Sequence, residues 1–138
     1  MGKLTSKTKK IILISIASTS VLSLIIFSYS FFEIYRSVKT NCLRAQNEYK
    51  DNCVESLIKL IQSEDKTYRE KNTAVWTLGQ LADKKALPFL YELGKSLPQQ
   101  EKCSYDSYLC KYEVQKAIKW CEIGNLTSWM YKNNDSWR

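Results

Sequence analysis

The pattern of apolar and polar positions separates an uncharged N-terminal stretch from a mixed remainder. Residues 11–32 contain no charged side chain. At a rise of about 1.5 Å per residue, a helix of this length spans roughly 33 Å, which is enough to cross the hydrocarbon core of a bilayer. A buried core helix is the alternative, but the rest of the chain is too small to surround a helix that is apolar on every side. The stretch therefore predicts a transmembrane anchor.

The flanking charges predict how this anchor is oriented. Residues 1–10 hold four lysines and no acidic residue, whereas the other flank carries charges of both signs. Because basic flanks stay in the cytoplasm, we expect a cytoplasmic N-terminus over residues 1–10 and an extracytoplasmic C-terminal domain. A cleaved signal peptide is the alternative, since Ser28 and Ser30 precede Phe31 at suitable spacing.

Three hydroxyl residues repeat every four positions within the anchor, namely Ser15, Thr19 and Ser23. At this spacing they share one face of a helix, where small side chains let a second membrane helix approach closely. The alternative is that the hydroxyls bond to the backbone of their own helix. The stripe is a candidate packing surface for another membrane helix.

Two helices are predicted soon after the anchor. Apolar residues recur at helical spacing from 54 to 61, and the polar residues 62–65 end that pattern. Thr67 and Glu70 then have the spacing of a capping box, so a second helix should begin at Tyr68. The buried stripe of this second helix should comprise Ala74, Val75, Leu78 and Leu81.

A third helix should follow after a short turn. Pro88 falls within its first turn, where the missing N–H costs little, and Gly94 is a natural stop. Gly79 in the preceding helix leaves room for close packing, so these two helices are expected to form an antiparallel hairpin. The inner face of the third helix should comprise Leu87, Leu90 and Leu93.

Residues 68–93 combine a charged start, a Leu-Gly pair, a short acidic turn and an Ala-Leu-Pro opening of the next helix. In this pattern they resemble a HEAT-like repeat of the type found in phycobilisome-lyase-related proteins. Trp76 and Thr77 depart from the pattern, because small residues are commoner there. The resemblance implies helical repeats that scaffold protein contacts and sometimes accompany chromophore-attaching enzymes. The matching residues are Arg69, Ala74, Leu78, Gly79, Leu81, Asp83, Ala86, Leu87, Pro88 and Leu90.

Weaker copies of this unit on both sides predict an all-α fold in which the anchor precedes a short α-solenoid of antiparallel helix pairs. We expect repeats over residues 38–62, 66–95 and 106–131, inside one domain of residues 33–131, and a separate polar tail over residues 132–138. Three helix pairs are about the minimum for a stable stack, because each pair buries its apolar face only on its neighbours.

All five cysteines lie beyond the anchor, where an oxidising compartment would permit disulfides. Cys42 and Cys53 could join the first hairpin, whose turn should fall between them. Cys103 could pair with Cys110 or with Cys121. The last two would lie about 16 Å apart on one helix and could not pair with each other. One thiol should remain, either packed in the core or available to a partner.

Composition argues against most chemistry. The chain has no histidine, so the usual general base and the commonest metal ligand are missing. The cysteine spacings fit neither a zinc site nor a Cys-x-x-Cys redox pair. The formal net charge is +7, but beyond the anchor basic and acidic residues are interspersed, unlike a nucleic-acid-binding face. We expect no enzyme activity, no cofactor, no metal and no nucleic-acid partner.

These patterns favour a membrane-anchored extracytoplasmic module that binds or scaffolds another protein and contacts the bilayer through residues 11–32. An accessory subunit of a larger membrane complex, held by the hydroxyl stripe, is one alternative. A lyase-like enzyme accessory is another, implied only by the resemblance. Aromatic and arginine side chains dominate binding hot spots, although each could instead serve the fold. The candidate partner contacts are Arg69, Trp76, Tyr91 and Trp129.

Overall fold

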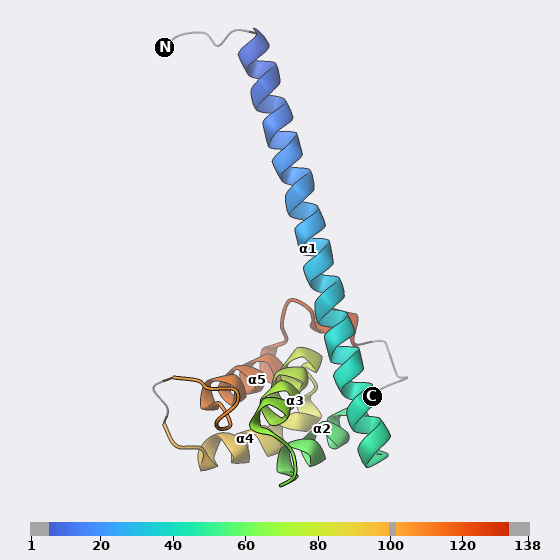
Figure 1. Ribbon diagram of the computed structural model, residues 1–138, viewed down its shortest axis with the longest axis vertical. Coiled ribbons are helices and arrows are strands. Elements are labelled where there is room, and N and C mark those ends of the chain that lie inside the picture. The colour runs from blue at the N-terminus through green and yellow to red at the C-terminus, as the bar shows by residue number, and fades with distance from the viewer. Residues whose placement is uncertain (1–5, 100–101, 133–138) are drawn as a thin grey trace. The chain divides into compact units, whose positions relative to one another are not determined.

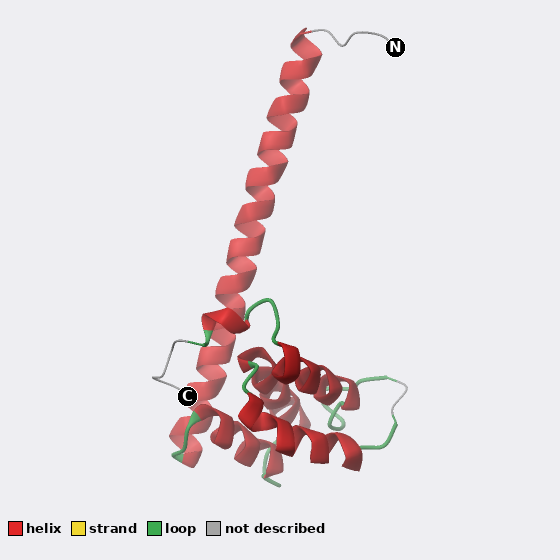
Figure 2. Ribbon diagram, turned by 180° about the vertical axis from the view of Figure 1, so that it is seen from behind, coloured by secondary structure: helices red, strands yellow, loops and turns green. Residues whose placement is uncertain are grey.

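The computed structural model describes residues 6–99 and 102–132, and within them every regular element is helical (Figures 1 and 2). The all-α expectation is therefore confirmed for this part of the chain. The elements in order are α1 (Ser6–Tyr49), α2 (Cys53–Gln62), α3 (Tyr68–Leu81), the 3-10 helix η1 (Lys84–Ala86), α4 (Leu87–Ser96), α5 (Lys111–Ile123) and the 3-10 helix η2 (Ser128–Met130).

The chain divides into two compact units between Ile34 and Tyr35, inside α1. In the N-terminal unit, large apolar side chains face outward, and Leu13, Ile14 and Leu24 are 65, 69 and 66 % exposed. By length and composition α1 could cross a membrane, and its most apolar window is not buried in protein. The expectation of one candidate membrane helix near the N-terminus is confirmed, and its apolar window does not lie in a core formed by the described residues.

The C-terminal unit has a core built around α3. Helix α3 makes its most extensive contacts with α5 and α2, and α4 packs against α5 (Figure 1). All of the stripe predicted for α3 is buried. The fully buried aliphatic side chains of this core are Val38, Leu57, Val75, Leu78, Leu90 and Val114.

The close approach that Gly79 permits is made to α5, and the expectation that it would serve a hairpin with the following helix is wrong. A Cβ atom on Gly79 would lie 3.0 Å from the Cα of Ala117 and 3.1 Å from Cε3 of Trp120. Helix α5 can come this close because the residue that faces Gly79, Ala117, is also small. The terminal segment expected over 106–131 also differs, since α5 is followed by η2 instead of a second α-helix.

The helix ends follow local sequence signals, with one exception. The capping box is formed as expected, with the N–H of Glu70 donating to Thr67 Oγ1 at 3.3 Å and the N–H of Thr67 donating to Glu70 Oε2 at 3.0 Å. Pro88 lies in the first turn of α4. However, α4 continues past Gly94 and ends at Ser96, two residues before Pro98. Proline disfavours a helical conformation of the residue before it, and this overrides the glycine signal.

Candidate protein-binding groove

A groove of about 180 Å³ opens on the C-terminal unit between α1, α2 and α3. Three buried side chains, Leu57, Leu60 and Ala74, provide its apolar lining. Polar side chains from α1 and α3 complete it. An apolar hollow with a few polar groups is the usual form of a binding site. The full lining is Asn41, Arg44, Leu57, Leu60, Arg69, Glu70, Thr73 and Ala74, and we call this surface the α1–α3 groove.

An ion pair stands at the edge of the groove. Arg44 Nη2 lies 2.8 Å from Glu70 Oε1, and the arginine side chain is 68 % exposed. Hydrogen bonds from Thr67, with a smaller contribution from Arg44, lower the pKa of Glu70. Glu70 is therefore a fixed anion that also caps α3. Arg44 is held only by an exposed pair of small energy, so it could turn to a partner carboxylate at little cost.

Of the four predicted partner contacts, Arg69 lines the groove. Its guanidinium donates from Nε and Nη2 to the two carboxylate oxygens of Asp106 at 2.6 and 2.7 Å. This bidentate pair lowers the pKa of Asp106 and connects α3 to the loop before α5. Arg69 thus shapes one end of the groove by a contact within the chain.

The other three predicted contacts lie elsewhere. Trp76 is half-buried on α3, and Trp129 is 66 % exposed on η2. Tyr91 on α4 donates a hydrogen bond to Glu122 on α5, and this bond raises the pKa of the tyrosine. None of these three lines the α1–α3 groove. The aromatic candidates therefore do not join Arg69 in one binding surface.

Four of the five candidate cysteines are brought into two pairs at disulfide distance. Cys42 and Cys53 join α1 to α2 with Cα atoms 5.0 Å apart, across the turn that the sequence predicts. Cys103 pairs with Cys110, with Cα atoms 5.3 Å apart, which decides between its two alternatives. Cys121 remains as a buried thiol, whose Sγ donates to the carbonyl of Leu78 at 3.5 Å. The packed alternative holds for this fifth cysteine.

We expect the Cys121 thiol to resist alkylation in the folded chain. Burial raises its pKa to about 12, and the side chain is 1 % exposed, so both thiolate and access are lacking at neutral pH. Mass spectrometry after iodoacetamide treatment should find no adduct on the native chain and one in denaturant without reductant. After reduction all five cysteines should react. Several adducts on the native, unreduced chain would contradict both pairings.

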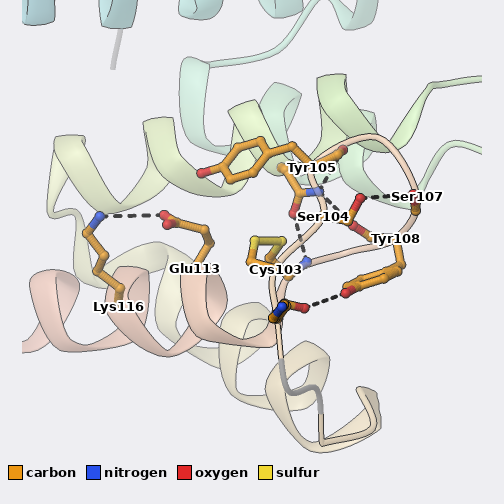
Figure 3. The surroundings of a disulfide bond; sticks show 10 residues. Cys103, Ser104, Tyr105, Ser107, Tyr108, Glu113 and Lys116 are labelled. Atoms are coloured by element: carbon orange, nitrogen blue, oxygen red, sulfur yellow. Dashed lines mark hydrogen bonds and ion pairs between the residues drawn. A yellow bond between two sulfur atoms is a disulfide. The ribbon is translucent and has the colours of Figure 1, made fainter.

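Asn72 on α3 holds the loop that the second cysteine pair closes. Its side chain is fully buried, and its Nδ2 donates to the carbonyls of Tyr105 at 3.1 Å and Tyr108 at 2.7 Å. Its Oδ1 accepts from the N–H of Cys110 at 2.9 Å. Figure 3 shows Tyr105 and Tyr108 on this loop around Cys103. Three hydrogen bonds and one disulfide therefore fix the position of this loop, and Asp106 on the loop binds Arg69.

The opposite end of α3 is held by residues that follow α5. Asn125 Nδ2 donates to the carbonyl of Gly79 at 2.9 Å, and Thr127 Oγ1 donates to Gln80 Oε1 at 2.5 Å. Both acceptors belong to the last turns of α3, so these bonds fix the C-terminal end of the helix. Helix α3, which forms one wall of the groove, is thus fixed at both ends by segments distant in sequence.

No protein-family model, curated protein or solved structure matches this chain. The resemblance of residues 68–93 to HEAT-like repeats accordingly stays a prediction that depends on those residues alone.

Several residues that support the groove were not predicted from the sequence. Asn72 carried a signal, because it lies three residues before Val75 and seven before Gly79, and this spacing places it on the buried face of α3. Asp106 and Asn125 lie in loops between helices, where no periodicity marks their direction. Their roles appear only once distant segments meet.

The hydroxyl stripe of the anchor is exposed over Ser15, Thr19 and Ser23. Thr19 Oγ1 donates to the carbonyl of Ser15 at 2.6 Å, as the alternative interpretation of these hydroxyls predicts. Its role in packing against another membrane helix is still a prediction.

Proposed function

We propose that this protein is a membrane-anchored, non-catalytic module whose helical domain binds another protein on the extracytoplasmic side. The observation that carries the proposal is the α1–α3 groove, which combines an apolar lining with a loosely held arginine. The domain follows a candidate membrane helix and contains two cysteine pairs at disulfide distance. Disulfides persist in oxidising compartments, and the N-terminal lysines favour the matching orientation.

The size of the groove supports one anchoring side chain of the partner. Its volume of about 180 Å³ is close to that of a cavity of roughly 150 Å³ that holds benzene, so one leucine- or phenylalanine-sized group would fill it. Arg44 would then meet an acidic group beside that anchor. A polypeptide segment with an apolar residue next to an aspartate or glutamate fits this combination best.

The arrangement of the helices supports a short HEAT-like stack as the scaffold. Helices α2, α3 and α5 lie in contact in that order, and such stacking places a binding surface along successive helices. The resemblance of residues 68–93 supports the same architecture. The proposal requires only that α3 be held rigidly. The hydrogen bonds of Asn72 at one end of α3, and those from Asn125 and Thr127 at the other end, hold it in this way.

A site-specific photo-crosslinker tests the binding proposal in intact membranes. Placed at the exposed position Arg44, it should yield a discrete adduct with a protein carrying an extracytoplasmic segment. The same group at Lys119, which is exposed on α5, is the matched control and should yield none. Thr73→Tyr fills the groove from α3 and should abolish the adduct from Arg44 without lowering the melting temperature of the domain. Equal adducts from both positions, or none from Arg44, would refute groove binding.

Protease added to intact cells tests the orientation separately. The domain after residue 34 should be digested, and the N-terminal lysines should be spared. Protection of the domain until the membrane is broken would place it on the cytoplasmic side and overturn this part of the proposal.

A further inference from the structure

A second surface lies where the chain leaves α5. Leu126, Ile123 and Trp129 are 75, 72 and 66 % exposed, and they are the three most exposed large apolar side chains among the described residues of the C-terminal unit. They fall within seven consecutive residues. We call them the apolar tip. Three large apolar side chains left this exposed within two helical turns' length of chain make the segment a candidate interaction surface.

The tip is held by an ordered backbone. Asn125, between two of its members, donates to α3, and Ser128 Oγ donates back to the carbonyl of Asn125 at 2.9 Å. Thr127 is buried and bonded to Gln80. The polar side chains of this segment therefore point inward and are satisfied, while Leu126 and Trp129 point to the outside. Their exposure is built into the fold.

An aromatic contact relates this segment to the first residue of the C-terminal unit. The ring of Tyr131, which is 1 % exposed, stacks on the ring of Tyr35 with centroids 6.2 Å apart and planes 1° apart. Tyr35 follows Phe32, the last residue of the uncharged stretch, by only three positions. Three residues of helix rise about 4.5 Å, so chain connectivity keeps Tyr131 close to the end of the candidate membrane span.

We propose that the apolar tip inserts into the headgroup region of the bilayer that holds α1. This inference depends on the proposed membrane anchor. Tryptophan favours the membrane interface, where its ring is in an apolar environment and its N–H meets polar groups. The exposed basic residues Arg36 and Lys132 lie next to the stacked tyrosines in sequence, as suits contact with lipid phosphates.

A lipid surface explains the tip better than a protein partner does, because the proposed anchor would bring the edge of the bilayer within about one helical turn of Tyr35. The tip would form a second attachment beside the anchor. Two attachments restrict the rotation of the domain about α1, and the α1–α3 groove would then face a constant direction relative to the membrane.

Tryptophan quenching by brominated lipid tests this proposal on the full chain. The chain is reconstituted into phosphatidylcholine–phosphatidylglycerol vesicles whose acyl chains carry bromine close to the headgroup. All variants carry Trp137→Phe, because that residue lies outside the described residues. Trp129→Phe should remove most of the bromine quenching. Trp120→Phe is the matched control, since Trp120 is half-buried with Lys116 over its ring, and it should leave the quenching nearly unchanged.

Flotation of the same vesicles separates the two ideas. If the chain floats with the vesicles and Trp129→Phe has no larger effect than Trp120→Phe, the tip does not touch lipid and the inference is overturned, while the anchor stands. The tip would then be a surface for protein. If the chain does not float, the anchor itself is refuted and the inference falls with it.

Discussion

Replacing Asn72 with alanine is expected to destabilise the C-terminal unit by about 3 kcal/mol or more. The substitution removes three hydrogen bonds to the backbone of the loop before α5, among them a buried one to the N–H of Cys110. A buried polar group left without a partner costs about 1–3 kcal/mol. Guanidinium unfolding of the full chain in detergent, followed by tryptophan fluorescence, measures the change in the free energy of unfolding.

Two further variants define the cause of this effect. Asn47→Ala removes an exposed amide near the end of α1 and should change the free energy of unfolding by less than about 0.5 kcal/mol. Asn72→Asp keeps the shape of the side chain but directs a carboxylate at the carbonyls of Tyr105 and Tyr108, so it should also destabilise. If Asn72→Ala and Asn47→Ala have the same unfolding midpoint, Asn72 does not hold the loop before α5 in the way described.

Replacing Gly79 with valine is expected to destabilise the same unit by about 3 kcal/mol, at the upper end of the usual range for overpacking. The Cβ atom of the new side chain would lie 3.0 Å from the Cα of Ala117. Because that Cα belongs to the backbone, it cannot move out of the way by a change of rotamer. Helix α5 must shift away from α3, which loosens the packing along both helices. The midpoint of guanidinium unfolding measures the loss.

The glycine in α4 offers a control with the opposite sign. A Cβ atom on Gly94 would lie 3.5 Å from side-chain atoms of Ile118 and Val114, which is ordinary van der Waals contact. Because alanine is favoured over glycine within a helix by about 1 kcal/mol, Gly94→Ala should stabilise the domain. Stabilisation by Gly79→Val, or destabilisation by Gly94→Ala, would contradict the helix contacts described above.

Asn72 and Gly79 do not line the groove, but they hold in place the helix and the loop that form it. Asn72 sets the loop that carries Asp106, and Asp106 holds Arg69 at the end of the groove. Asn72→Ala should therefore also weaken the crosslink from position 44 under conditions where the domain stays folded. The link between loop and groove is one that sequence inspection alone did not suggest.

Apart from the helix stop expected at Gly94, the features that depend on residues close together in the chain were predicted correctly from the sequence. The uncharged stretch of residues 11–32, the capping box at Thr67 and the place of Pro88 in the first turn of α4 are of this kind. So is the pairing of Cys42 with Cys53, because a single turn separates them. Local backbone geometry decides such features, and a short window of sequence contains all of its causes.

Tertiary structure decided the contacts that close over long loops. It placed α5 against Gly79, chose Cys110 over Cys121 as the partner of Cys103, and stacked Tyr131 on Tyr35. Each of these depends on which distant segments come together, and many pairings of short amphipathic helices bury similar apolar area. The choice among them rests on shape and on buried polar groups such as Asn72, whose partners are backbone atoms that no sequence pattern marks.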